Sequence, residues 1–91
     1  MFVHLGQGRV VNEKDIIGIF DIESSTVVSN TRIFLNKAEK SGIVTNVSLE
    51  MPKSFIVCSD KLKRNRVYIS QISSSVLSRR RDLTDILGLK K

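Results

Sequence analysis

The sequence has little of what enzyme active sites, metal sites and secreted proteins are built from. Its 91 residues contain one cysteine, one histidine, one proline and no tryptophan. A lone cysteine cannot form an internal disulfide, and no cysteine cluster or carboxylate pair joins the histidine at metal-ligand spacing. The apolar runs are too short to cross a membrane, and the N-terminus lacks a signal-peptide pattern. We expect a cytoplasmic protein with no cofactor, no metal and no membrane partner.

The residues that could carry covalent chemistry are isolated from one another. Cys58 lies in an apolar stretch, and the only base that could activate it, His4, is far away in the chain. Gly6-Gln7-Gly8 lacks the third glycine and the following helix of a dinucleotide-binding fingerprint, so it is more typical of a turn. The sequence therefore predicts that the protein is not an enzyme.

What the sequence does have is positive charge gathered in its last third. Residues 1–60 have a net charge of −1, whereas residues 61–91 carry nine basic and two acidic side chains, which gives the whole chain +6. A near-neutral body with one basic end indicates a polyanionic partner. A chain of this length forms one domain with a small core, and oligomerisation is a common remedy for such marginal stability.

Apolar patterning predicts several short strands and one main helix. β-Branched and aromatic residues predict strands over 2–5, 9–11, 16–22, 54–59 and 66–70. Helical spacing predicts a helix over about 25–41, and Gly42 is placed to end it. The less regular segments are 43–51, a loop or irregular strand; 73–77, a turn or short helix; and 82–91, a tail or short helix. The expected fold is α+β, a small antiparallel sheet of about four to five strands with one main helix.

Two basic clusters and one lysine are the candidate phosphate-binding residues. The candidates are Lys53, Lys61, Lys63, Arg64, Arg66, Arg79, Arg80 and Arg81. Residues 60–65 join two strands as the tip of an antiparallel hairpin, where charges could contact phosphates or simply protect a sheet edge in solvent. The arginine run 79–81 has the same two interpretations. No aromatic residue interleaves with these clusters, so contact with a duplex backbone fits better than base stacking.

An ordered set of short segments resembles one bacterial protein family. The segments are Val3-His4-Leu5-Gly6, Val10-Val11, Asp15 to Asp21, Pro52 to Val57, Tyr68-Ile69-Ser70 and Ile72 to Leu77. Together they resemble the RemA/RemB family of extracellular-matrix regulatory proteins, and the RemB branch in particular. The resemblance runs in order over about residues 2–81, and the order is more specific than any single segment.

The resemblance implies a cytoplasmic regulator of biofilm-matrix genes that binds duplex DNA. It also implies a small unit similar to LytTR DNA-binding domains that assembles into a homo-oligomeric ring. RemA-type proteins carry a basic cluster just before the penultimate strand, where this chain has Glu50-Met51-Pro52-Lys53, and Asp15 stands where they have another basic residue. Only Lys53 keeps the charge, so the hairpin cluster is the candidate to replace the lost contacts.

The resemblance predicts a single RemA/RemB-like domain over residues 1–81. Residues 82–91 lie outside the resemblance and are expected to form a C-terminal tail or a short helix. The leading hypothesis is a non-enzymatic DNA-binding transcriptional regulator. Two other classes stay open on the charge pattern alone. One is an RNA-binding accessory protein, and the other is a protein-interaction module whose basic face meets an acidic partner or an anionic membrane surface.

Overall fold

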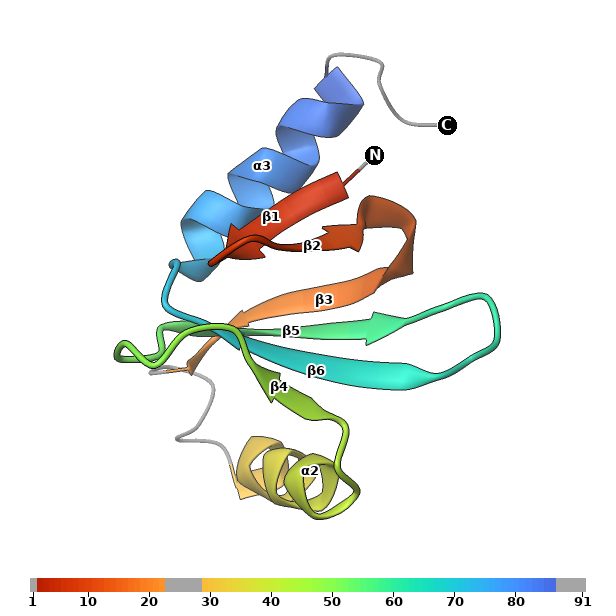
Figure 1. The fold of residues 1–91 in the computed structure, drawn as a ribbon, viewed down its shortest axis with the longest axis vertical. Helices are drawn as coiled ribbons and strands as arrows, with labels where there is room; N and C mark the ends of the chain where they lie inside the picture. Colours follow the sequence, from red (N-terminus) through yellow and green to blue (C-terminus); the bar gives the residue numbers. More distant parts are fainter. Residues whose placement is uncertain (1, 23–28, 87–91) are drawn as a thin grey trace.

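The computed structural model describes residues 2–22 and 29–86, which form two sheets and two helices (Figure 1). The first sheet pairs β1 (Phe2–Gly6) with β2 (Arg9–Asn12), and the short 3-10 helix η1 (Glu13–Asp15) follows it. The second sheet has the strand order β3-β5-β6-β4, from β3 (Ile16–Asp21), β5 (Ser54–Ser59), β6 (Asn65–Ser70) and β4 (Val44–Asn46). The helices are α2 (Ser29–Lys40) and α3 (Ser74–Ile86).

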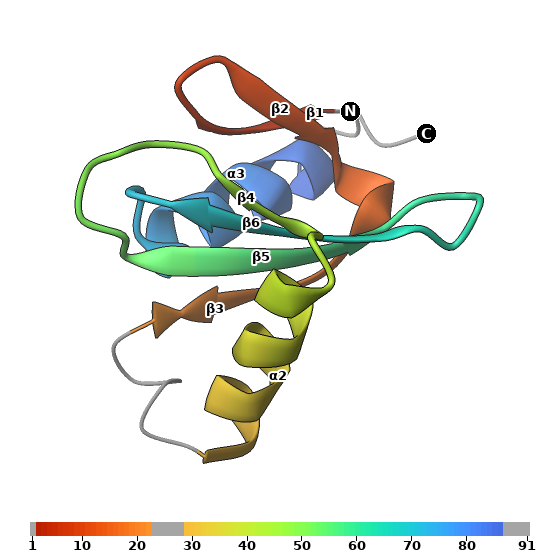
Figure 2. The same ribbon diagram turned by 60° about the horizontal axis from the view of Figure 1, so that its bottom comes forward.

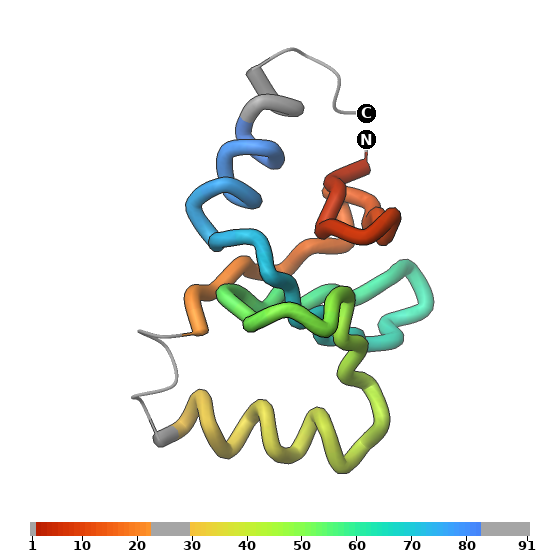
Figure 3. Tube along the Cα trace, turned by 60° about the vertical axis from the view of Figure 1, so that its left-hand side comes forward, coloured from red at the N-terminus to blue at the C-terminus, as the bar shows by residue number. Residues whose placement is uncertain are grey.

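The four-stranded sheet is covered on both faces. The β1–β2 hairpin and α3 lie against one face, and α2 lies against the other (Figures 1 and 2). A tube drawn from another side separates the two helices in the same way, with the strands between them (Figure 3). Burial on both faces explains why β5 reads as a nearly continuous apolar run in place of a strict alternation.

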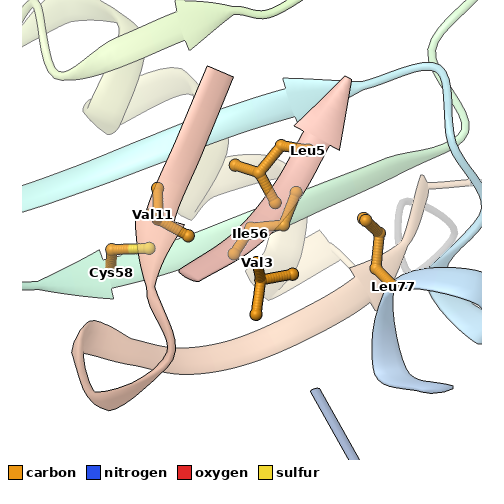
Figure 4. Packing of buried hydrophobic residues seen from close by; sticks show 6 residues of the cluster. All are labelled: Val3, Leu5, Val11, Ile56, Cys58 and Leu77. Carbon is orange, nitrogen blue, oxygen red and sulfur yellow. The ribbon is translucent and has the colours of Figure 1, made fainter. Parts of the chain in front are cut away.

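Two separate hydrophobic clusters stabilise the two faces. The first contains Ile56 and Cys58 of β5 together with Val3, Leu5, Val11 and Leu77 from the covering hairpin and α3 (Figure 4). The second contains Phe55 of β5, Val67 of β6 and Ala38 of α2. Two buried serines of the second sheet form hydrogen bonds to neighbouring parts of the chain. One bonds to the first sheet, and the other bonds to the segment between β6 and α3. The Ser70 hydroxyl donates to the Leu5 carbonyl oxygen at 2.6 Å, and the Ser54 hydroxyl donates to the Ile72 carbonyl oxygen at 2.7 Å.

A bulge in β3 sets which of its side chains meet which face. Ile16 pairs with Cys58 and Gly18 with Val57, so Ile17 is an extra residue in the ladder. Ile16 and Ile19 therefore pack against the first cluster. Ile17 and Phe20 lie on the α2 side, where the Phe20 ring stacks on Phe55 with centroids 5.0 Å apart. A Cβ atom on Gly18 would lie 2.6 Å from the Phe20 ring, so only glycine allows this ring position.

The α+β class, all five predicted strands and the helix ending before Gly42 are confirmed. Gly42 takes a φ of +75°, the left-handed conformation expected after a helix. The first residues of the predicted helix, 25–28, lie outside the described residues.

The expectation of one antiparallel sheet was wrong in two respects. The strands divide into two sheets, and β4, in the segment read as loop or irregular strand, pairs in parallel with β6. A three-residue strand shows no clear alternation, and its parallel partner lies far along the chain, so local patterning could not reveal it.

The expectation of one main helix was also incomplete, because α3 is as long as α2. It runs without a break through Arg79–Arg81 and across residue 82, where the tail was expected to begin. The division into a domain over 1–81 and a tail over 82–91 stays a prediction, as do the LytTR-like relationship and the ring. No helix within residues 2–22 and 29–86 is both long and apolar enough to cross a membrane.

Candidate nucleic-acid interface

The connection between β5 and β6 is a tight loop organised by Asp60. One oxygen of the Asp60 carboxylate accepts the backbone N–H groups of Leu62 at 2.9 Å and Arg64 at 3.0 Å. The other oxygen accepts Nε–H of Arg64 at 2.8 Å. Lys63 takes a φ of +60° and donates its backbone N–H to the Asp60 carbonyl oxygen. One acidic residue therefore fixes the loop that carries Lys61, Lys63 and Arg64, while Arg66 lies at the start of β6.

All four basic residues of this hairpin are exposed to solvent. They are Lys61, Lys63, Arg64 and Arg66. The loop projects beyond the body of the molecule at one end of β5 and β6 (Figures 1 and 2). The charge of Arg64 is partly neutralised by its ion pair with Asp60. The pKa of Asp60 is lowered, first by the backbone hydrogen bond from Arg64 and then by the hydrogen bond and charge of the Arg64 side chain.

Lys53 lies at the other end of β5 from the hairpin loop. Its backbone N–H donates to the Ser70 carbonyl oxygen at 2.8 Å, and its carbonyl oxygen accepts the N–H of Ile22 at 3.0 Å. These bonds fix the backbone next to Pro52, which lies just before β5, where a residue without a backbone N–H interrupts no strand pairing. The Lys53 side chain is exposed. Since β5 separates the two sites, Lys53 and the hairpin loop form two patches.

The arginine run lies on α3 and is partly committed to intramolecular contacts. Arg80 Nη1 donates to the carbonyl oxygen of His4 in β1 at 2.7 Å. Arg81 Nε lies 3.7 Å from a carboxylate oxygen of Asp82. Arg79 is exposed and is the arginine of this run that is best placed to reach a ligand. The structure therefore divides the predicted site residues among three regions of the surface.

Arg9 and Tyr68 were missed as candidate site residues. The Arg9 guanidinium carbon lies 5.6 Å from the centroid of the Tyr68 ring, within the range of a cation–π contact. Tyr68 lines a cleft of about 340 Å³ together with Arg64, Arg66, Asp15 and Asp60. Arg66 and Tyr68 are two residues apart on β6, which predicts that they share a face. No sequence signal places Arg9 over the Tyr68 ring, because Arg9 arrives with the β1–β2 hairpin.

Cys58 and His4 do not form a catalytic pair. Cys58 is buried in the first hydrophobic cluster, while His4 is exposed on β1. Burial, together with the nearby negative charge of Asp15, raises the pKa of the Cys58 thiol to about 11. A thiol in this state is protonated at neutral pH and is a poor nucleophile.

Comparison with known proteins bears directly on the resemblance seen in the sequence. No protein-family model matches the chain. The chain is similar to the extracellular matrix regulatory protein B of Bacillus subtilis strain 168, with 38% identity over 82 residues. The alignment covers 88% of this chain and 89% of that protein. Such identity over nearly the full length of both chains shows common descent and a common fold, and the chain belongs to the RemA/RemB family of extracellular-matrix regulatory proteins.

Proposed function

We propose that the chain is a cytoplasmic, non-enzymatic transcriptional regulator of extracellular-matrix genes that binds duplex DNA as a homo-oligomer. The name of the Bacillus subtilis relative supports the regulatory role. The observation that carries the DNA-binding part is the β5–β6 hairpin, which displays four exposed basic residues, three on the loop that Asp60 organises (61, 63 and 64) and one at the start of β6 (66). A fixed backbone that displays cations beyond the body of a protein suits contact with phosphates.

The placement of the charges supports contact with the backbone of DNA in preference to base reading. Lys53, the hairpin loop and Arg79 are exposed on different regions of one small domain. One subunit would therefore engage few phosphates through any single patch. In an oligomer each patch is repeated, and several weak contacts sum through multivalency.

An exposed apolar surface supports the homo-oligomer. β3 is an edge strand, and Ile17 and Phe20 lie beside Phe34 of α2 around an apolar groove of about 330 Å³. Their exposed fractions are 65%, 41% and 41%. Monomers rarely leave such a patch next to an unpaired strand edge, since both favour association. We propose that this β3–α2 face, defined by Ile17, Phe20 and Phe34, meets a second copy of the chain.

The proposal is tested by comparing two variants in a duplex-binding titration. Replacing Lys61, Lys63, Arg64 and Arg66 together by alanine should weaken binding by roughly 1–3 kcal/mol per engaged subunit, the scale of a few charged hydrogen bonds. Lys53→Ala should have the smaller effect, since it removes one charge. Both variants should keep the wild-type elution volume in size-exclusion chromatography, because neither alters a core residue.

Several outcomes would contradict parts of the proposal. A quadruple variant that binds DNA like the wild type would make the hairpin loop a solvated surface only. Tighter binding to single-stranded RNA than to duplex DNA would favour the RNA-binding alternative. Binding to anionic vesicles or to an acidic protein, with no binding to either nucleic acid, would favour the interaction module.

A further inference from the structure

The loop between β4 and β5 carries two large apolar side chains that the rest of the chain leaves uncovered. Leu49 is 105% exposed and Met51 is 81% exposed, the two largest values among the large apolar residues that the structure describes. We propose that the loop tip, defined by Leu49, Glu50 and Met51, docks in the apolar groove of the β3–α2 face of a second copy of the chain. The inference rests on the proposed homo-oligomer and names the surface that fills the groove.

Hydrogen bonds hold the loop tip in place before any partner binds. The backbone N–H groups of Val47 and Lys53, at the two ends of the loop, donate to successive carbonyl oxygens at the end of β6, at 2.9 and 2.8 Å. Within the loop, the Glu50 N–H donates to the Ser48 hydroxyl oxygen at 3.1 Å. A tip that is already ordered loses little conformational freedom on docking, and this favours association.

The groove matches the loop tip in polarity and in charge. Its volume is about 330 Å³, and none of the residues that line it is charged. Lys37 follows Phe34 by one turn on the same side of α2, and its side chain is exposed beside the groove. Among residues 2–22 and 29–86, no carboxylate lies within 4.0 Å of the Lys37 ammonium. Glu50 would therefore meet an available cation when Leu49 and Met51 enter the groove.

The loop tip and the groove lie on opposite sides of the four-stranded sheet (Figure 2). Leu49 and Glu50 line one hollow together with Gln7, in the turn of the β1–β2 hairpin that covers the first face. The groove lies on the other face, beside α2. Two different copies would therefore occupy the two surfaces of one chain. Contacts of this head-to-tail kind close into a ring or extend into a filament, so they lead beyond a dimer.

The charge of the loop favours a protein surface over DNA as the partner of the tip. Apolar side chains on exposed elements can also insert between the base pairs of a duplex. Glu50 is the only charged residue within 47–52, and its carboxylate would then lie close to phosphates of the same sign. In the groove of a second copy the same carboxylate lies beside Lys37. Insertion into DNA is the alternative against which the docking is tested.

The test mixes two variants that each lack one of the two surfaces. The Leu49→Asp, Met51→Asp double variant lacks the tip, and Phe34→Asp lacks the groove. Each alone should have a smaller mass than the wild type in size-exclusion chromatography with light scattering. Mixed at about 100 μM, well above a micromolar Kd, they should form a dimer of one copy of each and nothing larger, because one tip and one groove remain to pair. Leu62→Asp, which adds a carboxylate at an exposed leucine of the hairpin loop, should keep the wild-type mass.

Charge reversal within this mixture tests the contact between Glu50 and Lys37. Glu50→Lys in the Phe34→Asp copy should weaken the mixed dimer about fivefold, the scale of an exposed ion pair. Lys37→Glu in the other copy should have the same effect. Both reversals together should restore the affinity, because the two charges are then exchanged. A combination as weak as the single reversals would overturn the pairing of these two residues.

The outcomes separate this inference from the proposed function. A tip variant with the wild-type mass, or two smaller variants that form no mixed dimer, would overturn the docking and leave the proposed homo-oligomer standing. A tip variant that keeps the wild-type mass but loses affinity for duplex DNA would show insertion into DNA in place of docking. A wild-type protein that is a monomer would overturn the homo-oligomer itself.

Discussion

Arg64 and Asp60 form an ion pair of 2.8 Å across the loop that carries the densest positive charge of the chain. The same carboxylate accepts two backbone N–H groups of the loop, from Leu62 and Arg64. Asp60 therefore orders the loop and at the same time reduces its positive charge. If the loop binds phosphates as proposed, its affinity should reflect both effects, and substitution of Asp60 can separate them.

Asp60→Asn should strengthen binding to duplex DNA several-fold. The amide oxygen of asparagine can still accept the backbone N–H groups, so the loop keeps its shape, while Arg64 is released from its ion pair. Asp60→Ala serves as the comparison, because it removes the charge and also the acceptor that fixes the loop. If Asp60→Asn binds DNA no better than the wild type in a titration at constant salt, Arg64 does not contact phosphates.

Phe34→Asp should break the assembly into smaller species. The wild type is expected to form a stable oligomer larger than a dimer, and a carboxylate on the β3–α2 face would have to be buried without a partner. Asn36→Asp, which adds the same charge at an exposed position of α2, should leave the assembly unchanged. The measurement is size-exclusion chromatography with light scattering. Equal masses for the wild type and Phe34→Asp would contradict the assignment of this face.

Cys58 should resist thiol reagents in the folded protein at pH 8 and react rapidly once the protein is unfolded. Its folded pKa of about 11 lies above the unfolded value near 9. The folded state therefore binds the proton more tightly. The resulting stability is fully present below about pH 9 and is lost as the pH rises toward 11. A reaction with a chromogenic disulfide reagent at the same rate with and without denaturant would show that the thiol is accessible.

Leu77→Ala should lower the free energy of unfolding by about 2–5 kcal/mol, the cost of deleting a fully buried leucine side chain. Leu77 has no exposed surface and connects α3 to the cluster formed by β1, β2 and β5. Leu62→Ala is the matched control, because Leu62 is 72% exposed on the hairpin loop and should change stability little. Chemical denaturation monitored by circular dichroism gives both values. A Leu77→Ala variant as stable as the control would contradict the packing of α3 on this cluster.

The sequence predicted local structure well and the arrangement of the sheets less well. Strands 54–59 and 66–70 were identified because β-branched and aromatic residues cluster there, and the polar segment between them is typical of a hairpin connection. The predicted turn or short helix after Ser73 is the start of α3, where the Ser73 hydroxyl accepts the Val76 N–H at 3.3 Å. β4 and the division into two sheets depend on pairing between distant segments, which local patterning does not record.

The candidate site shows the same limit. Charge counting found the hairpin cluster, because four basic residues within six positions are visible in any sequence. It could not show that Asp60 neutralises Arg64, that Arg80 donates to the His4 carbonyl oxygen, or that Arg9 lies over Tyr68. Each of these contacts requires the folded geometry, and each changes which cations remain available for a partner.

The most direct test of the central claim is the salt dependence of duplex DNA binding by the wild-type protein. The Kd of one duplex would be measured at several salt concentrations from low to physiological ionic strength. If the basic patches bind phosphates, the slope of log K against log salt should be steep, with about −0.9 for each phosphate neutralised. A slope near zero, or no binding at low salt, would contradict the account of this protein as a phosphate-binding DNA regulator.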